Sequence, residues 1–215
     1  MRTQRRATTQ PHQTPPELRR PIAVAITGGI GAGKSAALEA FAEHGAATVS
    51  SDEIVHHLLQ HDPEVRRTLV AELGEVIIGP DGAIDRARVA DVVFADRAKL
   101  EFLEGVLHPR VAAEYLRWRE QLSRLPNPPP VCVTEVPLLY EAGGESRFDK
   151  VVVITAPAKL REQRRRVRRD GREERLIPDK EKVKRADYSY VNTGTLEELD
   201  AWVAGVLADL TARAA

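Results

Sequence analysis

The stretch Gly28–Ser35, GGIGAGKS, fits the pattern G-x-x-x-x-G-K-[ST] and decides how the rest of the chain is interpreted. It follows a short apolar run, Ile22–Thr27, and precedes residues 34–45, where apolar residues recur at helical spacing before a glycine. Glycines let the backbone turn several N–H groups toward one anion, and the start of the helix adds positive charge. A plain glycine turn needs no such flanking strand and helix, so the stretch predicts a loop that holds nucleotide phosphates.

Two residues of this loop carry specific expectations. Lys34 is expected to span the β- and γ-phosphates of ATP, and the hydroxyl of Ser35 is expected to reach Mg²⁺. The loop residues expected to bind ATP are Gly29, Ile30, Gly31, Ala32, Gly33, Lys34, Ser35 and Ala36. The loop alone leaves the reaction open, because kinases, GTPases, motor ATPases and helicases all use such loops.

The elements around the loop predict an α/β fold with a parallel sheet, because a strand, a phosphate loop, a helix and a second strand follow one another. Further strands are expected within 46–52, 131–140, 148–156 and 186–194, and helices over most of 53–125, over 157–171 and over 195–214. The last helix begins with a capping box, Thr195 followed by Glu198.

Composition excludes several classes of protein. Lys+Arg and Asp+Glu are both 32 in 215 residues, so no overall field favours nucleic acid or a membrane surface. No apolar run approaches the roughly 18 residues of a membrane span, and the start of the chain lacks the apolar core of a secretory signal. We therefore expect a cytoplasmic protein. Residues 1–20 are expected to be a disordered tail rather than a transit peptide, and the single cysteine, Cys132, a buried strand residue.

Asp52 is the first candidate for the chemistry. It follows the second predicted strand, at the carboxyl edge of the sheet, where ligands bind in open α/β folds. A carboxylate there can accept a proton from an attacking hydroxyl. The alternative is that Asp52 caps the helix that starts at the next residues, and one side chain could do both.

A run rich in arginine follows the fourth predicted strand and contains Arg161, Arg164, Arg165, Arg166, Arg168 and Arg169. Arginines that close over a transferring phosphoryl group neutralise its charge, whereas a solvated face or a path for an anionic substrate is the simpler interpretation. Successive helical residues point about 100° apart, so we expect most of these side chains to be solvated. Arg165 and Arg169 share a face.

Six segments in order resemble the dephospho-coenzyme A kinases, from Ile22 to the C-terminal helix. They are TGGIGAGKS (27–35), SSDEIVH (50–56), DGAIDRARVADVVF (81–94), LEGVLHPRV (103–111), VPLLYE (136–141) and ADYSYVNTG (186–194). The resemblance implies a three-layer P-loop kinase fold, similar to that of nucleoside monophosphate kinases. It implies a core at 21–60 and 130–215, a helical acceptor-binding insert at about 61–129 and an arginine-bearing lid at about 161–178.

The resemblance also implies the reaction, in which the γ-phosphoryl of ATP passes to the ribose 3′-hydroxyl of dephospho-coenzyme A. Asp52 would be the base and Arg165 the lid arginine. Arg165, Arg169, Asn192 and Gly194 would join the loop in binding ATP. Arg86, His108, Pro137, Leu138 and Leu139 would, with Asp52, bind the acceptor. A helix break at His108–Pro109 and core packing of the three residues 137–139 are the structural alternatives.

The chain departs from the family in two places. Ser50 stands where the family has the first Asp of its DAD motif, and His56 or His57 replaces a following arginine. Only REERLI separates RRDG from Pro178, so the lid is about two helical turns short, and Leu176 stands at an expected Gln. A related small-nucleotide kinase, or a nucleotide-binding homologue with weak turnover, is therefore the alternative. Small-molecule substrates and a monomer or small homo-oligomer are expected.

Overall fold

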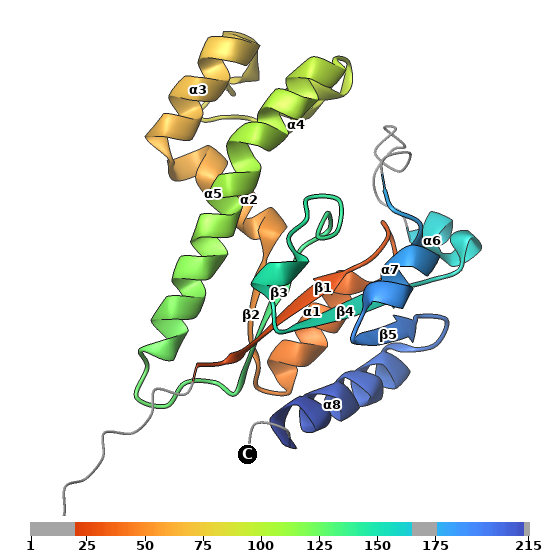
Figure 1. The fold of residues 1–215 in the computed structure, drawn as a ribbon. Coiled ribbons are helices and arrows are strands. Elements are labelled where there is room, and N and C mark those ends of the chain that lie inside the picture. The colour runs from red at the N-terminus through yellow and green to blue at the C-terminus, as the bar shows by residue number, and fades with distance from the viewer. Residues whose placement is uncertain (1–19, 165–175, 213–215) are drawn as a thin grey trace, which may run out of the picture.

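The computed structural model describes residues 20–164 and 176–212. A five-stranded parallel sheet forms its centre, in the order β2-β3-β1-β4-β5 (Figure 1). The strands are β1 (Ile22–Thr27), β2 (Ala47–Ser50), β3 (Val131–Glu135), β4 (Lys150–Thr155) and β5 (Tyr188–Val191). The helices are α1 (Lys34–Glu43), α2 (Ser51–His61), α3 (Pro63–Leu73), α4 (Arg86–Phe94), α5 (Arg97–Ser123), α6 (Ala158–Arg164), α7 (Asp179–Arg185) and α8 (Leu196–Ala212), with the 3-10 turns η1 (Glu75–Ile77) and η2 (Glu145–Arg147).

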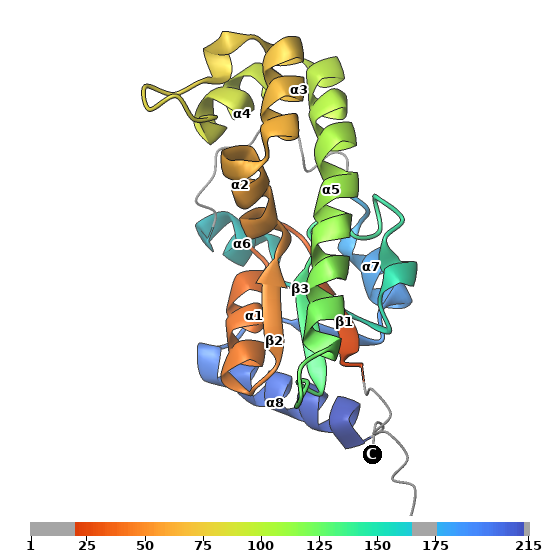
Figure 2. The ribbon, with the colours of Figure 1, turned by 90° about the vertical axis from the view of Figure 1, so that its left-hand side faces the viewer.

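The central strands form a sheet covered on both faces, which explains why they read as continuous apolar runs. On one face, Val24 and Ile26 of β1 pack with Phe41 of α1 and with Leu199 and Val203 of α8. Figure 2 shows α1 and α8 together on that side. On the other face, residues of β1 and β4 pack with the segment after β3 and with residues next to α7. The result is the three-layer α/β fold that the sequence predicts.

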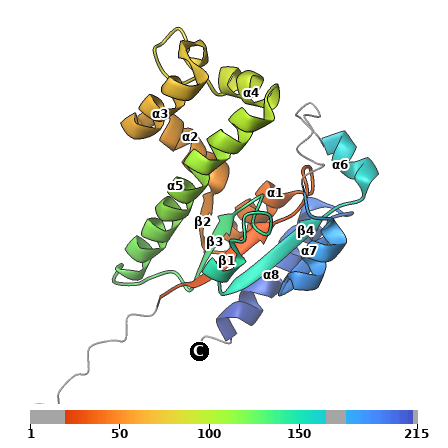
Figure 3. The same ribbon diagram turned by 45° about the horizontal axis from the view of Figure 1, so that its top comes forward.

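A second hydrophobic core lies away from the sheet. Residues of α3, η1, α4 and the first half of α5 pack together around Val65, Leu69, Ile77 and Val93. Figure 3 shows these helices standing off from the sheet, with α5 running from them down toward it. The lower half of α5 joins the sheet layer, where Val111 and Tyr115 pack against α2. One continuous helix therefore links the two cores.

Within the described residues, the predicted elements are confirmed except at four points. Residues 165–171 of the helix expected over 157–171 and residues 1–19 of the expected tail lie outside the described residues. The strand expected over 131–140 ends at Glu135, and turns follow it. Helix α5 runs without interruption through His108–Pro109, so the helix-break alternative is wrong. Helix α7 was not predicted. Arg20 was left outside the fold, yet its guanidinium donates two hydrogen bonds to Asp149, at 2.7 and 2.8 Å.

Two smaller predictions are confirmed. The Thr195 hydroxyl accepts from the N–H of Glu198, and the Glu198 carboxylate accepts from the N–H of Thr195. Cys132 is buried in β3, and burial raises the pKa of its thiol to about 11. Within residues 20–164 and 176–212, no helix is long and apolar enough to cross a membrane.

Candidate nucleotide and acceptor site

The phosphate loop has the backbone that its glycines predict. Gly28, Gly31 and Gly33 have φ angles of +143°, +75° and +98°, which side chains with a Cβ rarely adopt. Gly33 caps α1 in the left-handed conformation, and no described side chain caps the first turn of that helix. The N–H groups of this turn therefore remain available for an anion, as in other phosphate sites at helix starts.

Neighbouring elements approach the loop so closely that glycine is needed. A Cβ on Gly28 would lie 1.9 Å from the carbonyl oxygen of Ile154, and a Cβ on Gly33 would lie 2.2 Å from Nδ2 of Asn192. The same amide of Asn192 donates to the carbonyl of Ala32 at 2.9 Å. Asn192 is buried, so this predicted ATP residue ties the end of β5 to the loop.

Arg161 is the arginine that lies on the loop. A Cβ on Gly29 would lie 2.3 Å from its Nη1, and a Cβ on Gly31 would lie 2.7 Å from its carbonyl oxygen. Its guanidinium also pairs with Asp179 at 3.2 Å. Arg164 reaches the carbonyl of Asn192 at 3.4 Å. Both described arginines of the basic run therefore have partners, although Arg164 is exposed, and the other four lie outside the described residues.

Lys34, Ser35 and Glu135 meet where β1 and β3 end. Oε2 of Glu135 accepts from the Ser35 hydroxyl at 3.3 Å, and Oε1 lies 3.9 Å from Nζ of Lys34. Lys34 Nζ also donates to the carbonyl of Gly29 at 3.2 Å. Burial raises the pKa of the Glu135 carboxyl and lowers the pKa of the Lys34 ammonium, and each charge partly offsets the shift of the other.

The loop forms one end of a cavity of about 720 Å³. Its wall includes half of the predicted site residues, namely Ile30, Gly31, Lys34, Ser35, Asp52, His108, Pro137, Leu138 and Leu139. Glu135, Val111, Ala112 and Tyr115 also line it. A charged phosphate end and a more apolar side thus open into one space, which suits a substrate with a polar head and a long apolar tail.

Asp52 lies in the first turn of α2, directly after β2. The helix is capped by Ser50, whose hydroxyl accepts from the N–H of Asp52 at 3.2 Å, so the capping alternative for Asp52 is wrong. The Asp52 side chain is exposed toward the cavity and is close enough to influence the ionisation of Lys34 and Glu135. A carboxylate thus faces the place where phosphate would be held, with its side chain free of the cap.

The other wall of the cavity is built from α5 and the segment after β3. Glu104, His108, Val111 and Tyr115 recur at helical spacing on one face of α5, and all four line the cavity. Across from them, Leu139 is fully buried in the core while also lining the space. The core-packing alternative therefore holds at Leu139, and the same residue borders the space in which the acceptor is expected.

Some predicted residues lie elsewhere. Arg86 is exposed at the start of α4 and does not line the cavity. Gly194 lies under the Glu198 side chain, where an added Cβ would come within 1.4 Å of Oε2. Ala36 belongs to the first turn of α1. Arg165 and Arg169 are outside the described residues.

Sequence reasoning missed two residues of the site. Glu135 stands in an apolar run and was taken as part of a buried strand, although a carboxylate at the end of such a strand is the signal that could have found it. Arg161 was grouped with the solvated arginines. Its position, six residues after the end of β4 near the loop, becomes apparent only once the strands are placed side by side.

Comparison with known proteins agrees with this geometry. Residues 22–198 match the sequence model of the family described as Dephospho-CoA kinase. The dephospho-CoA kinase of Thermobifida fusca is 34% identical over 199 residues, covering 89% of this chain and 98% of that protein. That of Protochlamydia amoebophila is 39% identical over 183 residues, covering 82% of this chain and 90% of that protein.

Solved structures give the same result. A crystal structure from Thermus thermophilus matches with a TM-score of 0.71 and 34% identity, over 89% of this chain and 99% of that one. Dephospho-CoA kinase from Campylobacter jejuni matches with a TM-score of 0.62 over 87% of this chain and 96% of that one, and its 24% identity supports the fold alone. The chain therefore belongs to the dephospho-CoA kinase family.

Proposed function

We propose that this protein transfers the γ-phosphoryl group of ATP to the ribose 3′-hydroxyl of dephospho-coenzyme A, giving coenzyme A and ADP. One observation carries the proposal: the phosphate loop, an exposed carboxylate and a partly apolar wall line the same cavity of about 720 Å³. A nucleotide needs the phosphate loop, and a hydroxyl acceptor needs the carboxylate. A pantetheine tail needs the partly apolar wall.

The loop would hold the triphosphate. The uncapped first turn of α1 and the glycine backbone supply N–H donors, while Lys34 supplies a charge at the β- and γ-phosphates. Burial lowers the pKa of Lys34, which shows that its ammonium lacks full compensation within the protein. A polyphosphate would provide that compensation, so bound ATP would favour the charged form of Lys34.

The residues near the loop also fit Mg²⁺. The Ser35 hydroxyl and the Glu135 carboxylate are oxygen donors, which this ion prefers, and they are 3.3 Å apart. Ser35 would hold the ion directly, and Glu135 would fix the Ser35 hydroxyl or a water bound to the ion. Bound Mg²⁺ would neutralise charge on the β- and γ-phosphates.

Asp52 would act as the general base. As the 3′-oxygen forms a bond to the γ-phosphorus and the bond to the ADP oxygen breaks, the hydroxyl proton would pass to the Asp52 carboxylate. His108, Pro137, Leu138 and Leu139 would contact the acceptor from the cavity wall. Arg165 and Arg169, outside the described residues, remain proposed contacts of the phosphates, and Arg86, which does not line the cavity, is the weakest of the proposed acceptor residues.

A test incubates the purified full chain with Mg-ATP and dephospho-coenzyme A while ADP and coenzyme A are both measured. Coenzyme A should form in a 1:1 ratio with ADP. Coenzyme A at background level would refute the proposal. Turnover of another small nucleotide, or nucleotide binding without turnover, would then select between the two alternatives given above.

The Asp52→Asn variant tests the base. We expect kcat to fall by about 10²–10⁴, the usual loss when a positioned base is removed, while the melting temperature stays near that of the wild type because the side chain is exposed. Glu53→Gln is the matched control, because Glu53 is the next residue of α2, is also exposed and does not line the cavity. An Asp52→Asn rate within twofold of the wild type would show that Asp52 is not the base.

A further inference from the structure

A short charged helix carries a side chain that its sequence would place in solvent. Helix α7 is DKEKVKR, and its buried residue is Lys182, which has no exposed surface. Nζ of Lys182 lies 2.8 Å from Oε1 of Glu141, whose side chain is 13% exposed. Because a fully buried lysine is rare unless it is paired, this contact must be the reason that Lys182 can be inside.

Glu141 joins three parts of the chain. The same oxygen that pairs with Lys182 also accepts the backbone N–H of Ile177 at 2.9 Å. Glu141 itself lines the cavity, as does Leu176, the neighbour of Ile177. One carboxylate therefore fixes both the helix α7 and the chain entering it, relative to the wall of the site.

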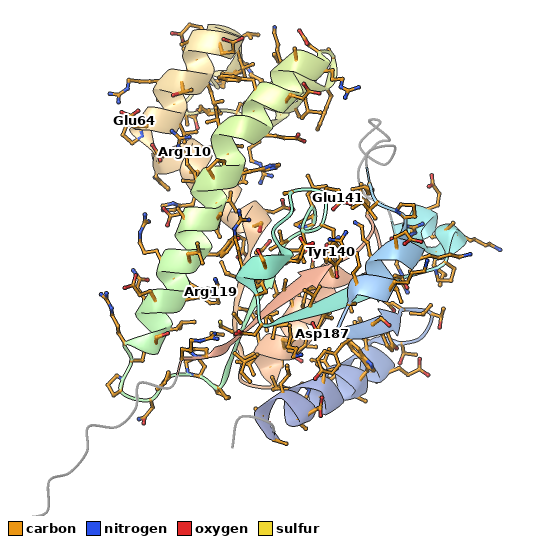
Figure 4. All side chains as sticks on the ribbon, in the orientation of Figure 1. Glu64, Arg110, Arg119, Tyr140, Glu141 and Asp187 are labelled. Carbon is orange, nitrogen blue, oxygen red and sulfur yellow. The ribbon has the colours of Figure 1, made fainter. Side chains whose placement is uncertain are left out.

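Arg185, one turn further along α7, holds the same wall from a second point. Its guanidinium lies 4.2 Å from the centre of the Tyr140 ring and pairs with Glu145. We call Val136–Glu145 the acceptor turn. Figure 4 shows Tyr140 and Glu141 in this turn, between α5 and α7. The inner side of the turn lines the cavity, and its outer side is held by α7.

Stability alone does not explain the buried pair. Removing two charges from water costs several kcal/mol per ion, and well-packed apolar residues of similar size are often as stable as a buried ion pair. Oε2 of Glu141 and Nζ of Lys182 are both buried without a hydrogen-bond partner among the described residues, so the two side chains form an ion pair and not a directed hydrogen bond. What the pair offers beyond an apolar contact is a charge attraction on the same oxygen that accepts the N–H of Ile177, so that the turn, the chain entering α7 and the helix meet at one atom.

We propose that Glu141 and Lys182 are a positioning pair for the acceptor. The pair holds Pro137, Leu138 and Leu139 at the distance from Asp52 at which the acceptor ribose fits between them. Lys182 does not line the cavity, so it acts through Glu141 and not by contact with a phosphate. This inference rests on the proposed function, since it takes the acceptor to bind along that wall.

The test compares the wild type with Lys182→Met, Glu141→Gln and the double variant Glu141→Gln/Lys182→Met. Each single variant leaves one buried group without its partner and is expected to melt at a lower temperature. The double variant removes both charges and keeps an acceptor for the Ile177 N–H, so its melting temperature should return to within a few degrees of the wild type. Lys184→Met is the matched control, because Lys184 is an exposed residue of the same helix, paired with Glu181 at the surface.

For the double variant we expect the KM for dephospho-coenzyme A to rise about tenfold or more, while the KM for ATP stays within twofold. A purely structural pair would instead leave both values unchanged once stability is restored. An acceptor KM within twofold of the wild type, or an equal rise in both KM values, would overturn the proposal.

Two further measurements cover the remaining cases. If the wild type makes no coenzyme A, the proposed function fails. Calorimetric titration of dephospho-coenzyme A into the wild type and the double variant then tests separately whether the pair positions the acceptor. Weaker binding to the variant supports it, and equal binding or no binding to either overturns it. If the double variant melts at a clearly lower temperature than the wild type, amide exchange in the folded protein is compared instead. A larger increase in exchange rate over 136–145 than over 22–27 supports the proposed role of the pair, and an equal increase in both segments overturns it.

Discussion

Glu135 shows how a single buried charge can organise the nucleotide end of the cavity. Its carboxylate is 6% exposed at the end of β3, accepts from Ser35 and faces Lys34. Burial works against both charges, raising the pKa of Glu135 and lowering the pKa of Lys34. Such a pair is a weak source of stability, and its position beside the phosphate loop agrees with the role beside Mg²⁺ that we propose for Glu135.

Glu135→Gln should therefore impair the reaction more than the fold. Gln keeps a carbonyl that can accept from Ser35 but removes the charge, and loss of a group behind a metal ligand typically costs about 10–100-fold in metal affinity or activity. We expect kcat at limiting Mg²⁺ to fall by that factor and to recover in part at high Mg²⁺. The control is Glu120→Gln, which breaks an exposed pair with Arg124 on α5. Full activity at every Mg²⁺ concentration would contradict the assignment.

Asp149 governs a pH dependence at the other end of the sheet. It accepts from Arg20 and from the N–H of Ala23, and the hydrogen bond from Arg20 is the main reason that its pKa is lowered. The folded protein thus binds this proton less readily than the unfolded chain does. Its contribution to stability is present above the ordinary pKa of 3.8 and is lost as the pH falls through the folded value.

Asp149→Asn should lower the melting temperature at pH 7, and the difference should shrink as the pH falls below 3.8. Asn can still accept from the N–H of Ala23, so the loss comes from the charge that faces Arg20. Since Arg20 is 68% exposed, screening weakens that pair, and we expect a loss of at most about 1 kcal/mol, or about 2–4 °C in a chain of this size. Calorimetry from pH 3 to 7 measures the difference, with Asp91→Asn on the exposed face of α4 as control. A gap that widens as the pH falls would show the opposite sign.

Helix α5 is the element that connects the two cores, and a proline interrupts its hydrogen bonds but not its course. Pro109 has no N–H to donate to the carbonyl of Gly105, four residues earlier. The side chain of Arg110 donates from Nη1 to the next carbonyl, that of Val106, at 2.7 Å, which does not replace the bond missing at Gly105. His108 and Val111, on either side of the proline, both line the cavity. The helical hydrogen bond that Pro109 cannot donate is therefore missing at the point where α5 forms the wall of the site.

Pro109→Ala should stabilise the protein and weaken acceptor binding. Alanine is favoured over proline by about 3 kcal/mol within a helix, and the more flexible unfolded chain removes up to about 1 kcal/mol of that gain. The melting temperature should rise by about 4–8 °C. The KM for dephospho-coenzyme A should rise as the α5 wall shifts. Gly105→Ala is the control, since a Cβ there meets nothing within 4 Å, and it should add stability without changing KM.

Helices α1 and α7 show why only part of this site could be predicted. Helix α1 is predicted by the glycine loop before it, by apolar residues at helical spacing and by Gly45 after its end. The second has seven residues, of which Val183 is exposed and Lys182 is buried. Its position depends on a partner, Glu141, about forty residues earlier, so no local pattern could reveal it. Glu135 could not be predicted for a related reason, because its side-chain partners Lys34 and Ser35 come from α1, about a hundred residues earlier.

The two hydrophobic cores of the molecule stand in different relations to the candidate site. Short valine-rich strands and the phosphate motif were enough to predict the parallel sheet, since these features act over short stretches of sequence. The cavity was harder to predict because α2, α5 and the acceptor turn meet across the sheet edge. The second core, around Val65 and Ile77, supports the upper half of α5, and its buried residues do not line the cavity. Val55 of α2 packs against this core and does line the cavity.

The separation of the two cores predicts how the whole chain responds to ligands in hydrogen–deuterium exchange. A non-hydrolysable ATP analogue with Mg²⁺ should slow exchange at the loop and the first turns of α1, residues 28–37. Dephospho-coenzyme A should slow exchange in the wall formed by α5 and the acceptor turn, over 104–115 and 136–142. Neither ligand should protect α3 and α4, over 63–94, because their core lies apart from the cavity.

The pattern of protection separates two descriptions of the molecule. If the outer helices only support α5, their amides exchange at the same rate with and without dephospho-coenzyme A. If instead they close over the acceptor, residues 63–94 gain protection when it binds, and Arg86 at the start of α4 would then be the residue to substitute. Because Arg86 is exposed and does not line the cavity, we expect the first result, and Arg86→Ala should leave the KM for the acceptor within twofold of the wild type.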